Sequence, residues 1–184
     1  MNITEILEGS PDYAKDIKLN YSKVLNENIL EKKLLYGIIL ISSLATKDDL
    51  LQKAALKEVK EFIDDDYIND VYGAYSLMAM NSIYYRFTHL ATEFDYSSMP
   101  ANLRMQFMTK HKMESTDFEM LCLAVAAIIG CGKCINAHDT ILRNNNVSSQ
   151  NIQTVVRVAA IINAISIILF FKCRFSIIFS SFGL

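Results

Sequence analysis

The most informative stretch of the chain runs from Phe118 to His138 and reads FEMLCLAVAAIIGCGKCINAH. Its first part is apolar at almost every position, which is typical of a helix buried on most sides. Gly130 is a typical helix end, so a second helix is expected to begin near Cys131 and to run to about Arg143. The stretch therefore predicts two consecutive helices with a C-x-x-C pair at their junction.

The pair consists of Cys131 and Cys134, and His138 follows it. A spacing of three residues puts both sulfurs on one helix face, close enough for a disulfide after a modest adjustment. His138 lies four residues beyond Cys134, so its ring lies over the same face. The positive end of the helix dipole, the imidazole and Lys133 all favour the thiolate, which is the reactive form of cysteine. We expect a reactive dithiol here.

Other interpretations of the pair have requirements of their own. A structural zinc site needs four ligands, whereas His89 and His111 are isolated and no second pair exists. A c-type haem site needs histidine directly after the second cysteine, where this chain has Ile135. A thioredoxin-like motif follows a strand, but an apolar helix precedes it here. Two buried, inert cysteines remain an alternative.

Glu119 stands near the start of the apolar helix, twelve residues before Cys131. A carboxylate among apolar neighbours is either exposed at the helix end or paired. One interpretation is an acid that only stabilises the helix N-terminus. The other is a proton-relay partner that orients His138.

The composition of the whole chain agrees with a helical globular protein. Hydrophobic residues make up 52% and charged residues 21% of the 184 residues, which argues against intrinsic disorder. Only 6 glycines and 2 prolines are present, too few for the turns of a β-sandwich or barrel. The net charge of −2 gives no cationic surface for nucleic acid. The predicted class is all-α.

Capping residues and apolar periodicity place the remaining helices. Ser10 and Pro11 indicate a helix start, and Pro100 a short helix through Met108. Ser115, Thr116 and Asp117 are N-cap candidates for the helix from Phe118. The other expected helices are 31–45, one capped by Asp48 or Asp49, one over 67–87 after Asp64, and a last one capped by Ser148 or Ser149. Residues 34–46 loosely echo residues 118–130, which suggests a degenerate internal duplication, although two apolar helices can also look alike by chance.

The C-terminal region is unusually apolar. Residues 159–171 carry no charge but are too few to span a bilayer, which needs roughly 20 residues. We expect a single domain over 1–172 with a buried final helix, and an atypical apolar tail over 173–184 that packs loosely. A tail associated with a membrane is the alternative. The acidic N-terminus, Met1-Asn-Ile-Thr-Glu, is no secretory signal, and the cysteines form no disulfide framework, so we expect a cytoplasmic protein.

The site and its flanks resemble the alkylhydroperoxidase D (AhpD) family of the carboxymuconolactone decarboxylase-like superfamily. The motif is Glu119, an apolar helix, Gly130-Cys131-x-x-Cys134 and Ala137-His138. Three further stretches are similar to the family, and the resemblance covers roughly residues 1 to 165: PDYAKDIKLN over 11–20, MNSIYYR over 80–86 and LRM over 103–105.

This resemblance implies an AhpD-like helical bundle that assembles as a homotrimer and acts as a lipoyl-dependent peroxidase. Cys134 would attack the peroxide and become a sulfenic acid, and Cys131 would give a proton to the leaving group and then form the disulfide. His138 would be the base and Glu119 its proton-relay partner. Dihydrolipoamide on a lipoylated acyltransferase would reduce the disulfide, and the cysteines would pass electrons to an AhpC-type peroxiredoxin. No metal, haem or other bound cofactor is implied.

Two departures from the family pattern concern Lys133 and the tail. Some members have histidine where this chain has Lys133, and the family's short polar ending differs from the apolar residues after about Ser166. Two other functions stay open on the residues alone. One is a carboxymuconolactone decarboxylase-like reaction, which needs no dithiol, and the other is a decayed, non-catalytic helical copy.

Overall fold

The computed structural model describes the backbone of residues 1–181 and the side chains of residues 1–172. Every regular element in this part is helical, which confirms the predicted all-α class. The α-helices are α1 Ile3–Glu8, α2 Lys15–Asn26, α3 Lys32–Thr46, α4 Asp49–Val59, α5 Asp65–Leu90, α6 Ser115–Ile129, α7 Gly132–Asn144 and α8 Ser149–Ser181. Short 3₁₀ turns cover Asp12–Ala14, Tyr96–Ser98 and Gln106–Thr109.

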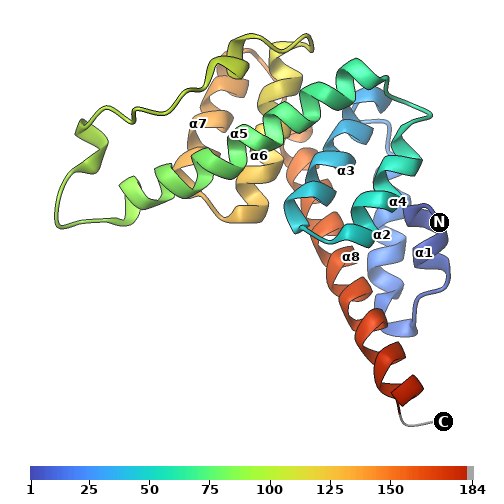
Figure 1. Cartoon of the computed structure of the whole chain (residues 1–184). Helices are drawn as coiled ribbons and strands as arrows, with labels where there is room; N and C mark the ends of the chain where they lie inside the picture. The colour runs from blue at the N-terminus through green and yellow to red at the C-terminus, as the bar shows by residue number, and fades with distance from the viewer. Residues whose placement is uncertain (182–184) are drawn as a thin grey trace.

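Helix α6 lies at the centre of the bundle, where it contacts α3, α5, α7 and α8 (Figure 1). Every residue from Met120 to Ala126 is buried. A helix enclosed on all sides has no solvent face, which is why its sequence carries no polar stripe. Burying each large apolar side chain contributes about 1.5–3 kcal/mol relative to leaving it in water. The apolar stretch that dominates the sequence is thus the middle of the core, and it positions the start of α7.

Most of the predicted helix boundaries are confirmed. The expected helices over 31–45 and 67–87 correspond to α3 and α5. Asp48 and Asp64 cap α4 and α5, each accepting a hydrogen bond at 2.8 Å from a backbone N–H three residues later. Ser148 accepts one at 3.1 Å from the backbone N–H of Asn151 at the start of α8. These side chains satisfy N–H groups that have no partner inside the helix.

The predicted helix start at Ser10 and Pro11 is wrong. Helix α2 begins only at Lys15, after a 3₁₀ turn, and the Ser10 hydroxyl instead donates to the carbonyl of Ile6 at 2.9 Å. The chain also forms α1, which the sequence analysis did not predict. Its signal is a capping box, in which Asn2 and Glu5 each accept a hydrogen bond from the other's backbone N–H.

Two further boundaries differ from expectation. The segment after Pro100 is not helical, and only a 3₁₀ turn forms at Gln106–Thr109. Phe107 in this turn packs so closely on Gly73 of α5 that a Cβ there would lie 2.0 Å from its ring, so tertiary packing sets the path of the segment. Residues 115–117 form the first turn of α6 rather than its cap, with Glu114 preceding them and no side-chain capping bond.

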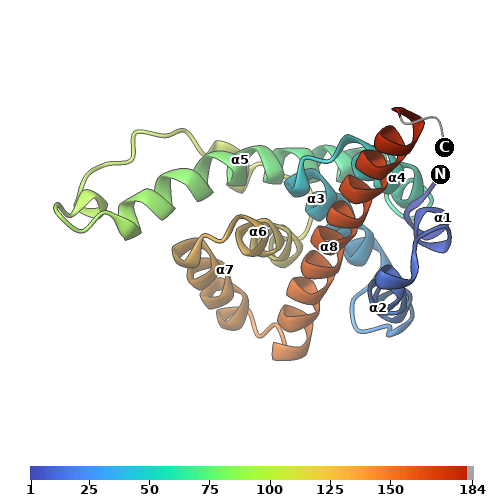
Figure 2. The same cartoon turned by 90° about the horizontal axis from the view of Figure 1, so that it is seen from below.

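The C-terminal end of α5 and the segment over 91–105 extend away from the bundle as an arm (Figures 1 and 2). Its apolar side chains are largely in contact with solvent. The ring of Tyr96 packs against those of Phe87 and Phe94, at centroid distances of 4.8 and 5.1 Å. The strongly exposed apolar residues of the arm are Ile83, Phe87, Leu90, Phe94 and Met99.

Helix α8 runs without interruption through the expected boundary at residue 172 (Figure 2). In the described part of the chain, the stretch Ser149–Lys172 is long and apolar enough to cross a membrane, with a mean hydropathy of 2.2. Half of its 18-residue apolar window is buried in the protein, where α8 packs on α3 and α6. This agrees with the expected buried final helix. The expectation that the side chains after Lys172 pack loosely lies outside the described residues.

The suggested internal duplication has a counterpart in the order of the helices. Helices α3 and α6 each have 15 residues, and each ends at a residue with a left-handed backbone, Lys47 (φ 60°) and Gly130 (φ 77°). Each is followed by a shorter helix, α4 or α7, and then by a long one, α5 or α8. A repeated three-helix unit is consistent with this order, and the duplication remains a hypothesis.

Candidate active site

The two cysteines lie at the junction of α6 and α7, as the spacing predicts. Gly130 ends α6 in the left-handed region, which a glycine adopts without the strain of a side chain. The backbone N–H of Cys131 then donates to the carbonyl of Ala126 at 3.0 Å. Cys131 is the N-cap of α7, and its Sγ accepts from the backbone N–H of Cys134 at 3.3 Å. The turn thus places both sulfurs at the positive end of α7.

The structure joins these sulfurs in a disulfide. The two Sγ atoms are 2.18 Å apart and the Cα atoms 5.3 Å apart, within the usual range of Cα separations. Cys131 is fully buried, whereas Cys134 keeps 5% of its surface exposed. The spacing of three residues therefore allows the two side chains to bond without unwinding α7.

Glu119 of α6 and His138 of α7 face each other across the helix pair. The Nδ1 atom of His138 lies 2.6 Å from Oε2 of Glu119, and the two side chains are only 8% and 13% exposed. When Glu119 is ionised its carboxylate can only accept, so Nδ1 then carries the hydrogen of this bond and Nε2 is the free nitrogen. Of the two interpretations of Glu119, the structure supports the one in which it is paired.

A cavity of about 270 Å³ opens beside the disulfide. Cys134 and His138 contribute to its wall, and Cys131 does not. The other lining side chains come from α5, α7 and the segment before α6, and most of them are apolar: Met78, Asn81, Tyr85, Met105, Met108, Lys133, Ala137 and Ile141. Of the two cysteines, Cys134 is thus the one that a molecule in the cavity can reach.

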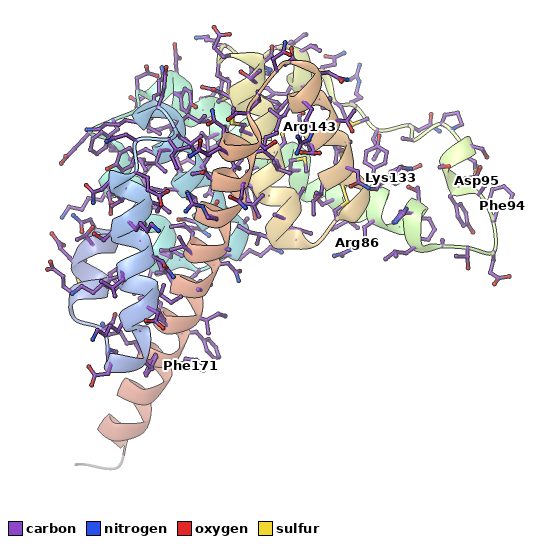
Figure 3. The ribbon with its side chains drawn as sticks, turned by 180° about the vertical axis from the view of Figure 1, so that it is seen from behind. Arg86, Phe94, Asp95, Lys133, Arg143 and Phe171 are labelled. Carbon is purple, nitrogen blue, oxygen red and sulfur yellow. A yellow bond between two sulfur atoms is a disulfide. The ribbon has the colours of Figure 1, made fainter. Side chains whose placement is uncertain are left out.

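Two cations lie close to the disulfide, as Figure 3 shows. Arg86 of α5 donates to the carbonyl of Ile129, the last residue of α6, at 3.0 Å. This bond satisfies an end carbonyl of α6 directly before the turn that carries the cysteines. Lys133 is turned toward α5, with Nζ 3.4 Å from the hydroxyl of Thr88 and 5.7 Å from the ring centre of Tyr85. The sequence analysis assigned Arg86 no role, and a single arginine on a helix gave no signal for one.

The other candidate groups lie apart from this cluster. Burial, with a smaller contribution from the nearby charge of Glu119, raises the pKa of the Cys122 thiol, which keeps it protonated and unreactive. His89 is exposed at the end of α5, and the ring of His111 stacks on that of Phe118 at 4.1 Å. Among the described residues, no three His, Cys, Asp or Glu side chains are grouped as metal ligands would be.

The sequence analysis singled out the cysteines, His138 and Glu119 but not the wall of the cavity. Met78, Asn81 and Tyr85 are spaced by three and four residues, so they share one face of α5. Met105 and Met108 line the same cavity and belong to the segment that was expected to be helical. The abundance of Met and Tyr in residues 67–87 was the only sign of this wall in the sequence, and it fits an ordinary core face equally well.

Comparison with known proteins gives one family. Residues 95–169 match the model of the carboxymuconolactone decarboxylase family. A protein from Brucella anthropi, named alkyl hydroperoxide reductase AhpD, is 41% identical over 92% of this chain and 97% of its own length. A protein of the same name from Acidobacterium capsulatum is 42% identical over 92% and 93% of the two chains. A third, from Solibacter usitatus, is 37% identical over 92% and 96%.

Proposed function

Since the chain belongs to the alkyl hydroperoxide reductase AhpD family, we propose that it is an antioxidant thiol peroxidase that reduces organic hydroperoxides through Cys131 and Cys134. The observation that carries this proposal is the placement of the disulfide. One of its sulfurs borders an apolar cavity, beside a histidine that is held by a buried carboxylate. Decarboxylation of a lactone would use neither the dithiol nor its disulfide.

Cys134 is the proposed attacking residue because it borders the cavity and Cys131 does not. In the reduced enzyme, its thiolate attacks the outer oxygen of the hydroperoxide. The O–O bond breaks, Cys134 becomes a sulfenic acid, and the alkoxide leaves as an alcohol after taking a proton from Cys131. The Cys131 thiolate then attacks the Cys134 sulfur and forms the disulfide, and the departing hydroxide leaves as water after taking the proton that His138 had received from the Cys134 thiol. One hydroperoxide thereby oxidises two thiols.

His138 is the proposed base for the Cys134 thiol. The hydrogen bond from Nδ1 to Glu119 leaves Nε2 to accept the thiol proton. The carboxylate orients the ring, and it completes the proton relay. Glu119 and His138 lie on two helices that pack against each other, so this orientation is held by the fold.

The disulfide needs a two-electron reductant to return to the dithiol. Dihydrolipoamide carried by an acyltransferase would supply two electrons, with thiol–disulfide exchange at Cys134 as the step. An AhpC-type peroxiredoxin would accept electrons from the resulting dithiol. We propose that this cycle runs in the cytoplasm, where such reductants are available.

We propose that the arm carries the contact between copies of a homotrimer. Ile83, Leu90, Phe94 and Met99 expose between half and two thirds of their surface. Soluble monomers rarely leave so many apolar side chains together in solvent. A Leu90→Glu variant should run as a monomer in size-exclusion chromatography with light scattering, whereas an Ile167→Glu variant on the exposed face of α8 should keep the mass of the unsubstituted protein. If the Leu90→Glu and Ile167→Glu variants have the same mass in solution, the arm does not form the contact between copies.

The proposed activity is tested by following cumene hydroperoxide in the presence of dihydrolipoamide, with and without a peroxiredoxin. Consumption should need the dihydrolipoamide and both Cys131 and Cys134, and it should accelerate when the peroxiredoxin is added. No consumption by the intact, reduced chain would overturn the proposal.

A further inference from the structure

We propose that the cavity beside Cys134 binds the substrate hydroperoxide, with the carboxamide of Asn81 holding the O–O–H group and the methionines around it holding the alkyl group. This inference rests on the proposed function and adds a substrate-binding residue to it. Its starting point is a polar group in the cavity that the protein itself leaves without a partner.

Asn81 is a buried polar residue of α5, with 5% of its surface exposed. Its Oδ1 atom is inaccessible and has no hydrogen-bond partner among the described residues. Most buried polar atoms in folded proteins are hydrogen-bonded. A buried atom without a partner loses its hydrogen bonds to water and gains none from the protein, which destabilises the fold. Asn81 also lines the cavity, and its N–H groups have no hydrogen-bond partner among the described residues, so this end of the amide points to a ligand that accepts from it.

The other polar groups of the cavity wall have their own contacts. His138 is bonded to Glu119, and Lys133 is directed at Thr88. The Tyr85 hydroxyl lies 4.0 Å from the Met105 sulfur, a weak acceptor. Asn81 is thus the amide of this wall that is still able to donate a full hydrogen bond to a ligand.

The ligand that satisfies this wall has a small polar head and an apolar body. A carboxamide offers a carbonyl acceptor and two N–H donors. Because Oδ1 of Asn81 is inaccessible, the N–H end of the amide is the one that can meet a ligand, and it can donate to the oxygen next to the alkyl group. The apolar side chains around it accept the alkyl group: Met78, Met105, Met108 and Ile141. The volume of about 270 Å³ suits a body the size of a cumyl group.

Asn81 would assist the chemical step as well as binding. When the Cys134 thiolate attacks the outer oxygen, negative charge develops on the oxygen that leaves with the alkyl group. An N–H that already points at this oxygen stabilises the transition state more than it stabilises the bound substrate. The reason is that the oxygen carries negative charge only in the transition state, and a hydrogen bond to a charged acceptor is stronger. The proton that completes the alcohol still comes from Cys131. The overall reaction remains one hydroperoxide and two thiols giving an alcohol, water and a disulfide.

The test measures how fast the reduced full-length chain loses thiols to cumene hydroperoxide and to hydrogen peroxide. An Asn81→Leu variant keeps the approximate size of the side chain and removes the N–H donor. It should lower the rate constants for both peroxides by about tenfold or more. The melting temperature should stay the same or rise, because an unpaired buried group is removed. Reduction of its disulfide by dihydrolipoamide should keep the unsubstituted rate, which a general distortion of the site would not allow.

Two further variants show whether the effect is specific to Asn81 and to the alkyl group of the substrate. Asn69→Leu makes the same change at an exposed position on the same helix and should leave both rates unchanged. Met108→Gln should slow cumene hydroperoxide more than hydrogen peroxide, since only the former has a body to place against the wall. If Asn81→Leu fails to fold, Asn81→Ala is judged by the same rates.

The outcomes separate this inference from the proposed function. Unchanged rates in Asn81→Leu and Asn81→Ala, with an active unsubstituted protein, would overturn the role of Asn81 and leave the peroxidase intact. A Met108→Gln variant that slows both peroxides equally would overturn the alkyl site. An unsubstituted protein that loses no thiols to either peroxide would overturn the proposed function itself.

Discussion

The Nδ1 atom of His138 lies 2.6 Å from Oε2 of Glu119, and this hydrogen bond ties the helix that begins at the cysteines to the central helix of the core. The pair is almost closed to solvent, with side chains 8% and 13% exposed. A water molecule therefore cannot easily replace either partner. The orientation of the imidazole depends on a residue that touches neither sulfur.

Replacing either member of this pair should slow the oxidation of Cys134 without unfolding the protein. His138→Gln removes the base, a loss that typically costs about 10²–10⁴-fold in rate. Glu119→Gln keeps a hydrogen-bond acceptor but not its charge, so its effect should be smaller, about tenfold. Stopped-flow measurement of thiol loss near neutral pH, with circular dichroism as the fold control, gives both numbers. If both variants lost their thiols as fast as the unsubstituted protein, the proposed relay would have no support.

Two glycines flank Cys131, and only one of them needs to be glycine. Gly130 has φ 77°, so Gly130→Ala should destabilise the protein by about 1–2 kcal/mol, although nothing lies within 4 Å of the new Cβ. Gly132 begins α7 and also has open space, so Gly132→Ala should be neutral or stabilise by about 0.5 kcal/mol. Urea unfolding compares the two. Equal effects would mean that backbone conformation is not the cause.

The ion pair that joins α2 to α8 should make stability depend on pH. Hydrogen bonds from the Arg157 guanidinium, together with its charge, hold the pKa of Glu27 below its ordinary value of 4.5. Because the folded pKa is the lower one, the stabilisation is complete above the unfolded pKa and is lost as pH falls through the folded pKa. Glu27→Gln should therefore cost stability near neutral pH and almost nothing at strongly acidic pH.

The measurement compares the free energy of unfolding of the Glu27→Gln variant with that of the unsubstituted protein from neutral to strongly acidic pH. Glu93→Gln, which changes an exposed carboxylate of the arm, serves as the control and should show no such dependence. A Glu27→Gln cost that stays constant from neutral to acidic pH would contradict the linkage to this carboxylate.

Removing the residues after Lys172 should keep the fold and the peroxidase activity and should improve solubility. Lys172 itself is retained because its Nζ lies 3.3 Å from the carbonyl of Ile6 and joins α8 to α1. Arg174 is the only charged residue among those removed, and the sequence predicts that they do not join the core. Light scattering and activity of the 1–172 chain test this. A truncated chain that is unfolded or inactive would show that the tail belongs to the core.

The parts of the fold that follow from local rules could be predicted from the sequence. Apolar runs gave α3 and α6, acidic caps gave α4 and α5, and Gly130 gave the turn to α7, because each signal lies within a few residues of its effect. The non-helical path after Pro100 could not be predicted, since it is set by the packing of Phe107 onto Gly73, far away in the chain.

The same distinction holds for the site. Cys131, Cys134 and His138 are neighbours along one helix, so their spacing alone predicts that they share a face. The partner of Glu119 needed the packing of α6 on α7, which the family resemblance supplied and helical periodicity does not. Asn81 was missed because a polar residue inside a helix is ordinary in sequence. Only the structure shows that it is buried, unpaired and beside Cys134.

The central claim, a dithiol cycle confined to Cys131 and Cys134, is tested most directly by counting thiols under denaturing conditions before and after one equivalent of cumene hydroperoxide. The reduced chain should show its four cysteine thiols before the peroxide and two after it, and a Cys122→Ser, Cys173→Ser chain should fall from two to none. The Cys134→Ser variant should lose none. Loss of the Cys122 and Cys173 thiols instead, or unchanged oxidation of the Cys134→Ser variant, would contradict the account.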